Sequence, residues 1–286
     1  MDRIGKYTMK PFTKNRKNVV LVVEEGHRKN SIHSVLEIDV TKAREIIAKI
    51  SKKTRTKVSF TGWIIKCVAE ALTKYKELNS YRSGRNKIAI FEDVDIAMPV
   101  ERYINGEYRT LAYILRKANE KSVMDITREI RKVQKEAIGE STQLLGKNLT
   151  RLERFALGAP VFVKKIVLIL TRRNAFLKKK YFGTAGVTAI GMKGKFPGWE
   201  IAMGGTSTVL LVVGGITKKP GIVNDKIAIR EYLHLSVSIN HDLIDGGPLV
   251  RFVDGLTNLF ENAFGLEQIL DENTLHSSKE AKNIRE

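Results

Sequence analysis

The side chain best placed for chemistry in this sequence is the imidazole of His241. It directly follows the alternating apolar segment Tyr232 to Ile239, and it precedes the stretch Asp242-Leu243-Ile244-Asp245-Gly246-Gly247-Pro248. Side chains at strand ends beside such turns are held by rigid backbone and stay reachable. An imidazole takes up and releases a proton near pH 7, and the Asp245 carboxylate can order the turn. The alternative interpretation is a purely structural turn, with Asp245 as the cap of the following helix.

Other catalytic and metal-binding motifs are absent from the sequence. Gly186 to Gly191 has the spacing of a phosphate-binding loop, but Met192 stands where that loop needs a lysine. The sequence contains neither a Gly-x-Ser-x-Gly nucleophile motif nor a His-Glu-x-x-His zinc motif. Cys67 is the only cysteine, which excludes an internal disulfide and a cysteine-rich metal site. We therefore expect no metal ion.

The helices and strands that must position His241 follow from the spacing of apolar residues. Alternation predicts strands at 33–40 and 232–239, and short strands are expected at 87–91 and 94–100. The continuous apolar run 209–213 predicts a strand buried on both faces, and Asn224-Asp225 predicts a hairpin turn. Helical spacing predicts helices at about 19–28, 41–50, 61–75 and 248–264. Ser122 and Asp125 form a capping-box pattern before a helix with the apolar stripe Val123, Ile126, Ile130, Val133 and Ile138. Residues 1–17 are expected to be irregular. The pattern is mixed α/β.

The stretch Ser236 to Gly246 resembles the His-x-x-x-Asp-Gly motif of the dihydrolipoamide acyltransferase catalytic domain of 2-oxo acid dehydrogenase complexes. Segments 16–40, 58–100 and 182–215 are similar to the family's opening helix and strand, to a helix and strand pair, and to the segment before the active strand. The resemblance covers residues 10–265 and is weakest over 101–181. It implies a chloramphenicol acetyltransferase-like fold, a two-layer mixed sheet with helices.

The resemblance implies a CoA-dependent acyltransferase. His241 would be the general base that takes a proton from the attacking thiol or hydroxyl. A hydroxyl upstream would stabilise the tetrahedral oxyanion, and Thr188, in the stretch 186–191 and 53 residues before His241, takes that position. Thr184, or a purely structural strand, is the alternative.

The resemblance makes Asp245 a structural carboxylate that pairs with a basic residue, for which Arg16 is a candidate. The flanks of the histidine depart from the family, which has Asp-His-Arg where this chain has Asn240-His241-Asp242. No residue that contacts coenzyme A is predicted from spacing.

Assembly and partners also follow from the resemblance. It implies a homotrimer in which His241 of one subunit meets Thr188 of its neighbour, and partner chains that are decarboxylase, flavoprotein or lipoyl-bearing subunits. The sequence contains no lipoyl or subunit-binding domain, so we expect a stand-alone form with no lipoyl group on this chain. The acyl acceptor could be a lipoyl domain on another chain or a different thiol, amine or alcohol.

The formal net charge of +19 is concentrated in a basic segment, residues 147–181, which holds ten Lys and Arg residues and one acid, Glu153. Pro160 predicts a break between two helices there. One interpretation is a solvated charged face on helices that pack on the core. The sharper hypothesis is a surface for anionic lipid, with a lipid-like acyl donor or acceptor.

Two further function classes are open. A non-catalytic interaction or scaffold protein of the same fold would explain the altered flanks of His241 and the missing lipoyl domain. Nucleic-acid binding is suggested by the charge but disfavoured by the 7% aromatic content and the lack of a stacking motif. No secretory signal or apolar run of ~18 residues is visible, so we expect a cytoplasmic protein. We expect one catalytic domain over residues 1–270 and a flexible polar tail over 271–286.

Overall fold

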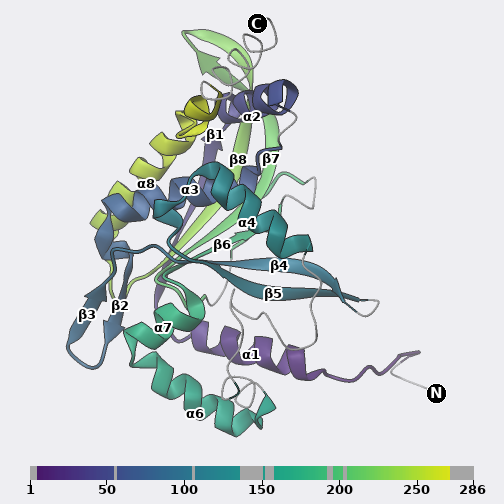
Figure 1. Cartoon of the computed structure of the whole chain (residues 1–286), viewed down its shortest axis with the longest axis vertical. Helices are drawn as coiled ribbons and strands as arrows, with labels where there is room; N and C mark the ends of the chain where they lie inside the picture. Colours follow the sequence, from purple (N-terminus) through teal and green to yellow (C-terminus); the bar gives the residue numbers. More distant parts are fainter. Residues whose placement is uncertain are drawn as a thin grey trace, which may run out of the picture.

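The computed structural model describes residues 5–54, 57–104, 107–135, 151, 158–191, 196–201 and 205–270. Its centre is a six-stranded sheet in the order β1-β8-β7-β6-β4-β5 (Figure 1). β6 runs parallel to β4 and β7, whereas the other neighbouring pairs are antiparallel. The strands are β1 (Ser31–Asp39), β4 (Ile96–Ile104), β5 (Glu107–Leu115), β6 (Ala185–Ala189), β7 (Val209–Val223) and β8 (Lys226–Asn240). The predicted two-layer mixed α/β architecture is confirmed.

Two groups of helices surround the sheet (Figure 1). The first contains α2 (Thr41–Thr54), α3 (Phe60–Lys74), α4 (Val123–Lys135) and α8 (Gly246–Glu261), with the short helices η1 (Lys76–Leu78) and η2 (Ala118–Glu120). The second contains α1 (Lys14–Gly26), α6 (Val161–Arg172) and α7 (Ala175–Phe182), which lie together at the bottom of Figure 1. A separate hairpin joins β2 (Ser80–Ser83) to β3 (Lys87–Ile90).

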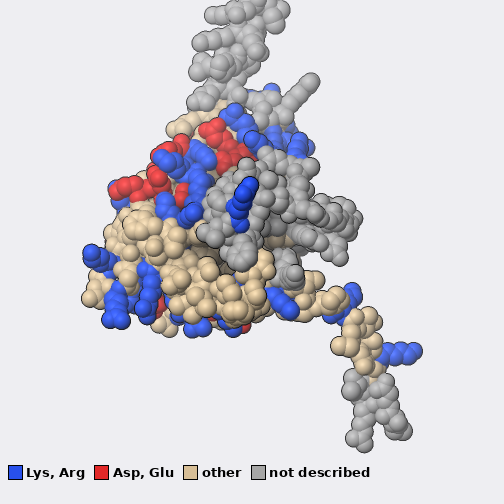
Figure 2. All heavy atoms as spheres, turned by 60° about the horizontal axis from the view of Figure 1, so that its bottom comes forward, with Lys and Arg blue, Asp and Glu red and all other residues tan. Residues whose placement is uncertain are grey.

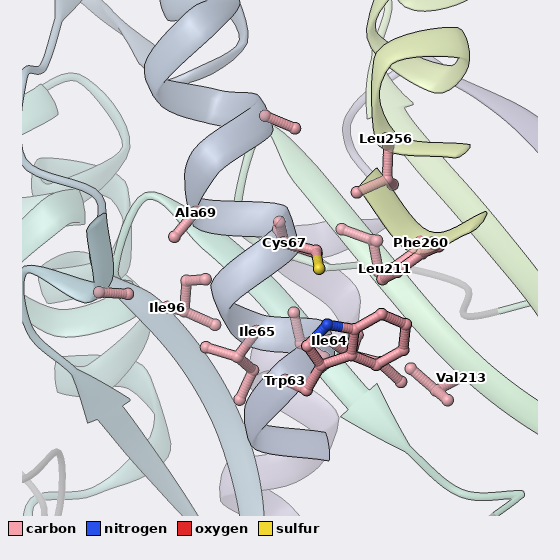
Figure 3. Close-up of a cluster of buried hydrophobic side chains, with 14 of the residues drawn as sticks. Trp63, Ile64, Ile65, Cys67, Ala69, Ile96, Leu211, Val213, Leu256 and Phe260 are labelled. Carbon is pink, nitrogen blue, oxygen red and sulfur yellow. The ribbon is translucent and has the colours of Figure 1, made fainter. Parts of the chain in front are cut away.

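The main core lies between the sheet and the first group of helices. One side of β8 contributes Leu233, Leu235, Val237 and Ile239, each at most 1% exposed. Trp63 of α3 packs on Phe260 of α8 with ring centroids 5.3 Å apart, and Cys67 lies beside them (Figure 3). Burial raises the pKa of the Cys67 thiol well above its usual range. Cys67 is therefore a protonated packing residue.

Several sequence predictions are confirmed in detail. Asn224 and Asp225 both have positive φ, 49° and 60°, as a tight hairpin turn requires. Ser122 and Asp125 cap α4 reciprocally, because each backbone N–H donates to the other's side chain, at 3.2 and 3.1 Å. The apolar stripe of α4 is buried from Val123 to Val133, whereas Ile138 lies outside the described residues.

One prediction on the N-terminal half is wrong, and two strands there were not predicted. Residues 14–17 are helical, because the Thr13 hydroxyl accepts a hydrogen bond from the Arg16 N–H at 3.3 Å and starts α1 earlier than expected. The strands β2 and β5 were not predicted. β5 is an edge strand that pairs only with β4, and edge strands carry polar residues that hide the apolar alternation.

The basic segment differs from its prediction in where its helices break. Pro160 precedes α6, as expected of a residue without a backbone N–H. A second break, between α6 and α7, was not expected. It falls at Asn174, whose Oδ1 accepts hydrogen bonds from the Phe176 and Leu177 N–H groups, both at 3.0 Å. Most of the segment before Pro160, and the predicted tail 271–286, lie outside the described residues. Among the helices the structure describes, none is long and apolar enough to cross a bilayer.

Candidate active site

The turn that carries His241 is fixed by backbone hydrogen bonds. The His241 N–H donates to the Asn30 carbonyl at 2.7 Å, which ties the end of β8 to the start of β1. The Leu243 and Ile244 N–H groups donate to the Asn240 carbonyl at 3.2 and 3.1 Å and close the turn. The imidazole itself is 47% exposed. A rigid backbone therefore presents a reachable ring, as the sequence predicts.

The two residues that flank His241 hold the turn with their side chains. Asn240 is 8% exposed, and its Oδ1 accepts from the Asp242 N–H at 3.1 Å. Asp242 in turn accepts a 2.8 Å hydrogen bond from Nδ2 of Asn30. These hydrogen bonds stabilise the turn without involving the imidazole.

Asp245 lies beside the ring, but the contact is loose. Its Oδ1 is 3.8 Å from Nδ1 of His241, which is within ion-pair range and beyond hydrogen-bond range. Asp245 also occupies the cap position of α8 without making a side-chain capping hydrogen bond.

Thr188 is far from His241 within one protomer. It lies on β6 opposite Val212 of β7, which in turn lies opposite Ser236 of β8. Ser236 is four strand positions before Asn240, a separation of about 13 Å along the sheet at the usual rise per residue. Thr188 is half-buried. One copy of the chain therefore does not bring the two predicted groups together.

The alternative hydroxyl and the candidate basic partner are placed elsewhere. Thr184 is fully buried and bonded to the backbone of Asp95, accepting from its N–H at 3.0 Å, so it serves structure. Arg16 is exposed on α1, beside Val19, Val20 and Glu24. No ion pair between Arg16 and Asp245 occurs among the described residues.

The sequence analysis missed a row of polar side chains on β8. His234, Ser236, Ser238 and Asn240 alternate with the core residues, so they face the side of the sheet away from α3 and α8. Ser238 lies 2.7 Å from Nδ1 of His33 on β1, and His234 Nε2 lies 3.2 Å from Glu37. The same alternation that predicts the strand could have indicated this row. By register, the row shares its face with Thr188.

A metal centre is not formed by the part of the chain that the structure describes: no three His, Cys, Asp or Glu side chains gather there.

The cations of α6 and α7 are engaged mainly by neighbouring elements. Arg172 makes two hydrogen bonds to the Glu25 carboxylate of α1, at 2.6 and 2.7 Å, and Lys164 donates to Asn18 at 2.8 Å. Lys179 donates to the Asp93 carbonyl at 2.8 Å. The contacts of Arg172 and Lys164 attach α6 to α1.

The outer side of α6 is apolar. It exposes Phe162, Ile166, Ile169 and Leu170, at 66, 54, 50 and 65%. We call these four residues the α6 stripe. In Figure 2, which brings the bottom of Figure 1 forward, Lys and Arg side chains lie along the left and lower edges of a broad uncharged surface. The interpretation that the basic segment packs its apolar residues on the core does not hold for this stripe.

Comparison with known protein families gives one match that spans most of the chain. The model for the 2-oxoacid dehydrogenases acyltransferase (catalytic domain) matches residues 5–145 and 182–266. Residues 146–181, which contain α6 and nearly all of α7, lie between the two matched parts. The match therefore separates the sheet and its helices from the basic segment.

A curated relative and two solved structures are similar to the chain over most of its length. The dihydrolipoyllysine-residue succinyltransferase component of the 2-oxoglutarate dehydrogenase complex of Buchnera aphidicola (from Schizaphis graminum) is 22% identical over 74% of this chain and 44% of that protein. A probable dihydrolipoamide acetyltransferase of Listeria monocytogenes has a TM-score of 0.63 and 21% identity over 90% of this chain and 95% of the other.

The second solved structure is the dihydrolipoamide acetyltransferase of Azotobacter vinelandii, with a TM-score of 0.66 and 15% identity over 93% of this chain and 96% of the other. It was studied for the catalytic role of a serine, a histidine and an asparagine, the asparagine four positions after the histidine. The chain spans 41–53% of the length of the curated relatives it matches.

Proposed function

The chain belongs to the family of 2-oxoacid dehydrogenase acyltransferase catalytic domains, and from this premise we propose that it transfers an acyl group between coenzyme A and a thiol. The observation that carries the proposal is the imidazole of His241, presented by a rigid turn at the end of β8 with Asp245 beside it. The Azotobacter enzyme is studied for a histidine with an asparagine at the same spacing. Here an aspartate stands in that place.

His241 acts as the general base in this proposal. Its Nε2 takes the proton from the attacking thiol, and the thiolate adds to the carbonyl carbon of the thioester. The tetrahedral oxyanion then collapses and the carbon–sulfur bond to the leaving group breaks. The leaving thiolate takes the proton from Nε2. Asp245, whose Oδ1 lies 3.8 Å from Nδ1, is a positioning residue for the ring in this proposal.

Thr188 donates its hydroxyl to the oxyanion, and a second copy of the chain supplies it. Within a protomer the two groups lie at different levels of the sheet, whereas a donor must lie about 3 Å from the oxyanion to stabilise it. On the family resemblance we propose a homotrimer in which each site joins His241 of one subunit to Thr188 of the next.

The acceptor we propose is a dihydrolipoyl group carried by another chain, with decarboxylase and flavoprotein subunits as further partners. The names of the relatives support this choice, because they act on a dihydrolipoyllysine residue or on dihydrolipoamide. They differ in acyl group, succinyl against acetyl. An amine, an alcohol or a lipid-like molecule is the alternative acceptor.

The test is release of free thiol from acyl-CoA, measured with acetyl-CoA and succinyl-CoA against a panel of acceptors that includes dihydrolipoamide. We expect thiol release with dihydrolipoamide, and we expect His241→Ala to lower the rate by at least ~10²-fold. A rate that is unchanged in His241→Ala would contradict the role of the imidazole.

A second candidate is a scaffold protein of the same fold. It is favoured by Asn240 and Asp242, whose side chains are used to hold the turn. This candidate predicts normal assembly and no thiol release with any donor or acceptor, so the same assay separates the two.

A further inference from the structure

A small cavity lies where α1, α6 and α7 meet the turn of His241. Its volume is about 160 Å³. We call it the junction cavity. Five cations line it: Arg28, Lys29, Arg82, Arg172 and Lys178. Among the described residues, two acids, Glu25 and Asp242, line it with them. The walls therefore carry an excess of positive charge.

The junction cavity connects the unmatched segment to the candidate active site. Residues 146–181 contribute Leu168, Thr171, Arg172 and Lys178 to its walls. The turn of His241 contributes Asn240, Asp242 and Leu243. A molecule held here would contact both residues 146–181, which the family model leaves unmatched, and the backbone that positions the imidazole.

Two lysines in the junction cavity lack an acidic partner among the described residues. Lys29 donates to the Ser207 carbonyl at 2.6 Å, and the Lys178 ammonium stands 5.2 Å from the centre of the Tyr81 ring. Both partners are uncharged. Glu25, by contrast, is occupied by the two hydrogen bonds from Arg172.

Burial and nearby positive charges make these two charges costly. The pKa of Lys29 is lowered to about 8, first by burial and then by the charge of Lys178, against Asp242 and Glu25, which raise it. Burial also lowers the pKa of Lys178, which Glu25 and Asp242 raise and Arg172 lowers. An anion between the lysines would offset both effects, because a buried charge is stabilised by an opposite charge at short distance.

We propose that the junction cavity binds one oxyanion, a carboxylate or a phosphate group, between Lys29 and Lys178. Its volume equals that of about five water molecules. That is below the ~300 Å³ at which pockets for whole small molecules begin. The cavity therefore takes a single charged group, either a free ion or the end of a larger substrate. If the oxyanion is the end of a larger substrate, the inference rests on the proposed acyl transfer.

The first experiment needs no enzymatic activity. Sodium sulfate is titrated into the intact protein at constant ionic strength, and the unfolding temperature is measured. We expect a rise of about 2–4 °C that saturates in the millimolar range, as for a ligand that binds only the folded state. Lys178→Met should remove most of this rise, and Lys29→Met is the second variant if the first fails to fold. Lys52→Met, an exposed lysine on α2, is the matched control.

The pH dependence gives the experiment a second readout. Sulfate stays fully charged from pH 6 to 9, so any change comes from the protein. The rise in unfolding temperature should shrink as the pH passes about 8, because Lys29 then loses its proton. A rise that does not saturate, and that is equal in the unchanged protein, the cavity variant and Lys52→Met, would overturn the proposal. It would mean that sulfate acts by general salting-out alone.

Acyl donors then identify the source of the oxyanion. If it is the carboxylate of the acyl group, Lys178→Met should raise KM for succinyl-CoA at least tenfold and leave KM for acetyl-CoA unchanged. If it is a phosphate of coenzyme A, both KM values should rise and dephospho-CoA should differ from CoA. Unchanged KM values together with saturable sulfate binding would assign the cavity to a free ion. If no acyl transfer occurs at all, the sulfate result still stands by itself.

Discussion

The sheet with α2, α3, α4 and α8, and the α6–α7 segment, are held in the molecule by different kinds of contact. Trp63 and Phe252 are fully buried in the first region. In the second, α6 buries only Thr171, and its attachment to α1 depends on polar contacts such as Arg172 with Glu25. The family match covers the first region and omits nearly all of the second. The first region is held by an apolar core. The second is attached by polar contacts, and it lines the junction cavity beside the turn of His241.

The largest effect should come from the apolar core. Phe252→Ala should lower the free energy of unfolding by about 3–5 kcal/mol, because the missing ring leaves a cavity between α8 and the sheet. Chemical denaturation measures this. Val250→Ala, on the same helix but 66% exposed, is the control and should change the free energy by less than about 0.5 kcal/mol. Equal effects of the two variants would remove the basis of the comparison.

Removing the polar attachment should have a smaller and more local effect. Arg172→Ala removes two hydrogen bonds from the Glu25 carboxylate, whose side chain is 15% exposed, and leaves it with Arg28, whose Nε lies 3.6 Å away. We expect a loss of about 1–2 kcal/mol, reduced by solvent screening because Arg172 is partly exposed. Hydrogen exchange should show faster opening of α6 with little change in α3.

Arg173→Ala is the matched control for this prediction, because Arg173 is the exposed neighbour of Arg172. Exchange that accelerates equally in α3 and α6 would mean that the two regions unfold together, against the comparison.

Within the matched region, a single helix cap should contribute less than the core. Ser122→Ala should cost about 1 kcal/mol. The hydrogen bond from Ser122 holds the pKa of Asp125 below its usual value. That stability is present above about pH 4 and is lost as the pH falls through the lower folded pKa. Stability measured from pH 7 to 3 should therefore decline less in the variant. An identical decline would show that the cap contributes nothing to the acid sensitivity.

The α6 stripe should contribute least to stability. Leu170→Ser should change the free energy of unfolding by less than about 0.5 kcal/mol, because the side chain is already exposed. The lipid hypothesis predicts that the same change lowers sedimentation with anionic vesicles. Ile227→Ser, on the β7–β8 hairpin and 82% exposed, is the control. Equal sedimentation of both variants and of the unchanged protein would count against a lipid surface.

The sequence predicted what depends on local pattern. The alternation along β8 placed the strand and the exit of His241, and the capping box placed α4. It failed where placement depends on distant residues. Arg172 and Glu25 are 147 positions apart, and neither has a local pattern that announces the other, so neither the attachment of α6 nor the junction cavity could be predicted. The proposal that Thr188 acts from a second copy comes from the family resemblance, because a separation of 53 residues along the sequence says nothing about the distance between two side chains.

The most direct test of the central claim mixes two inactive variants. His241→Ala lacks the base, and Thr188→Val lacks the hydroxyl. If the two groups meet between subunits, random exchange in a 1:1 mixture restores both groups in about one quarter of the sites of a symmetric trimer. We predict that thiol release from acyl-CoA recovers to about that share of the original rate. A mixture that exchanges subunits, as followed with differently tagged copies, and yet stays as inactive as its parents would contradict the account.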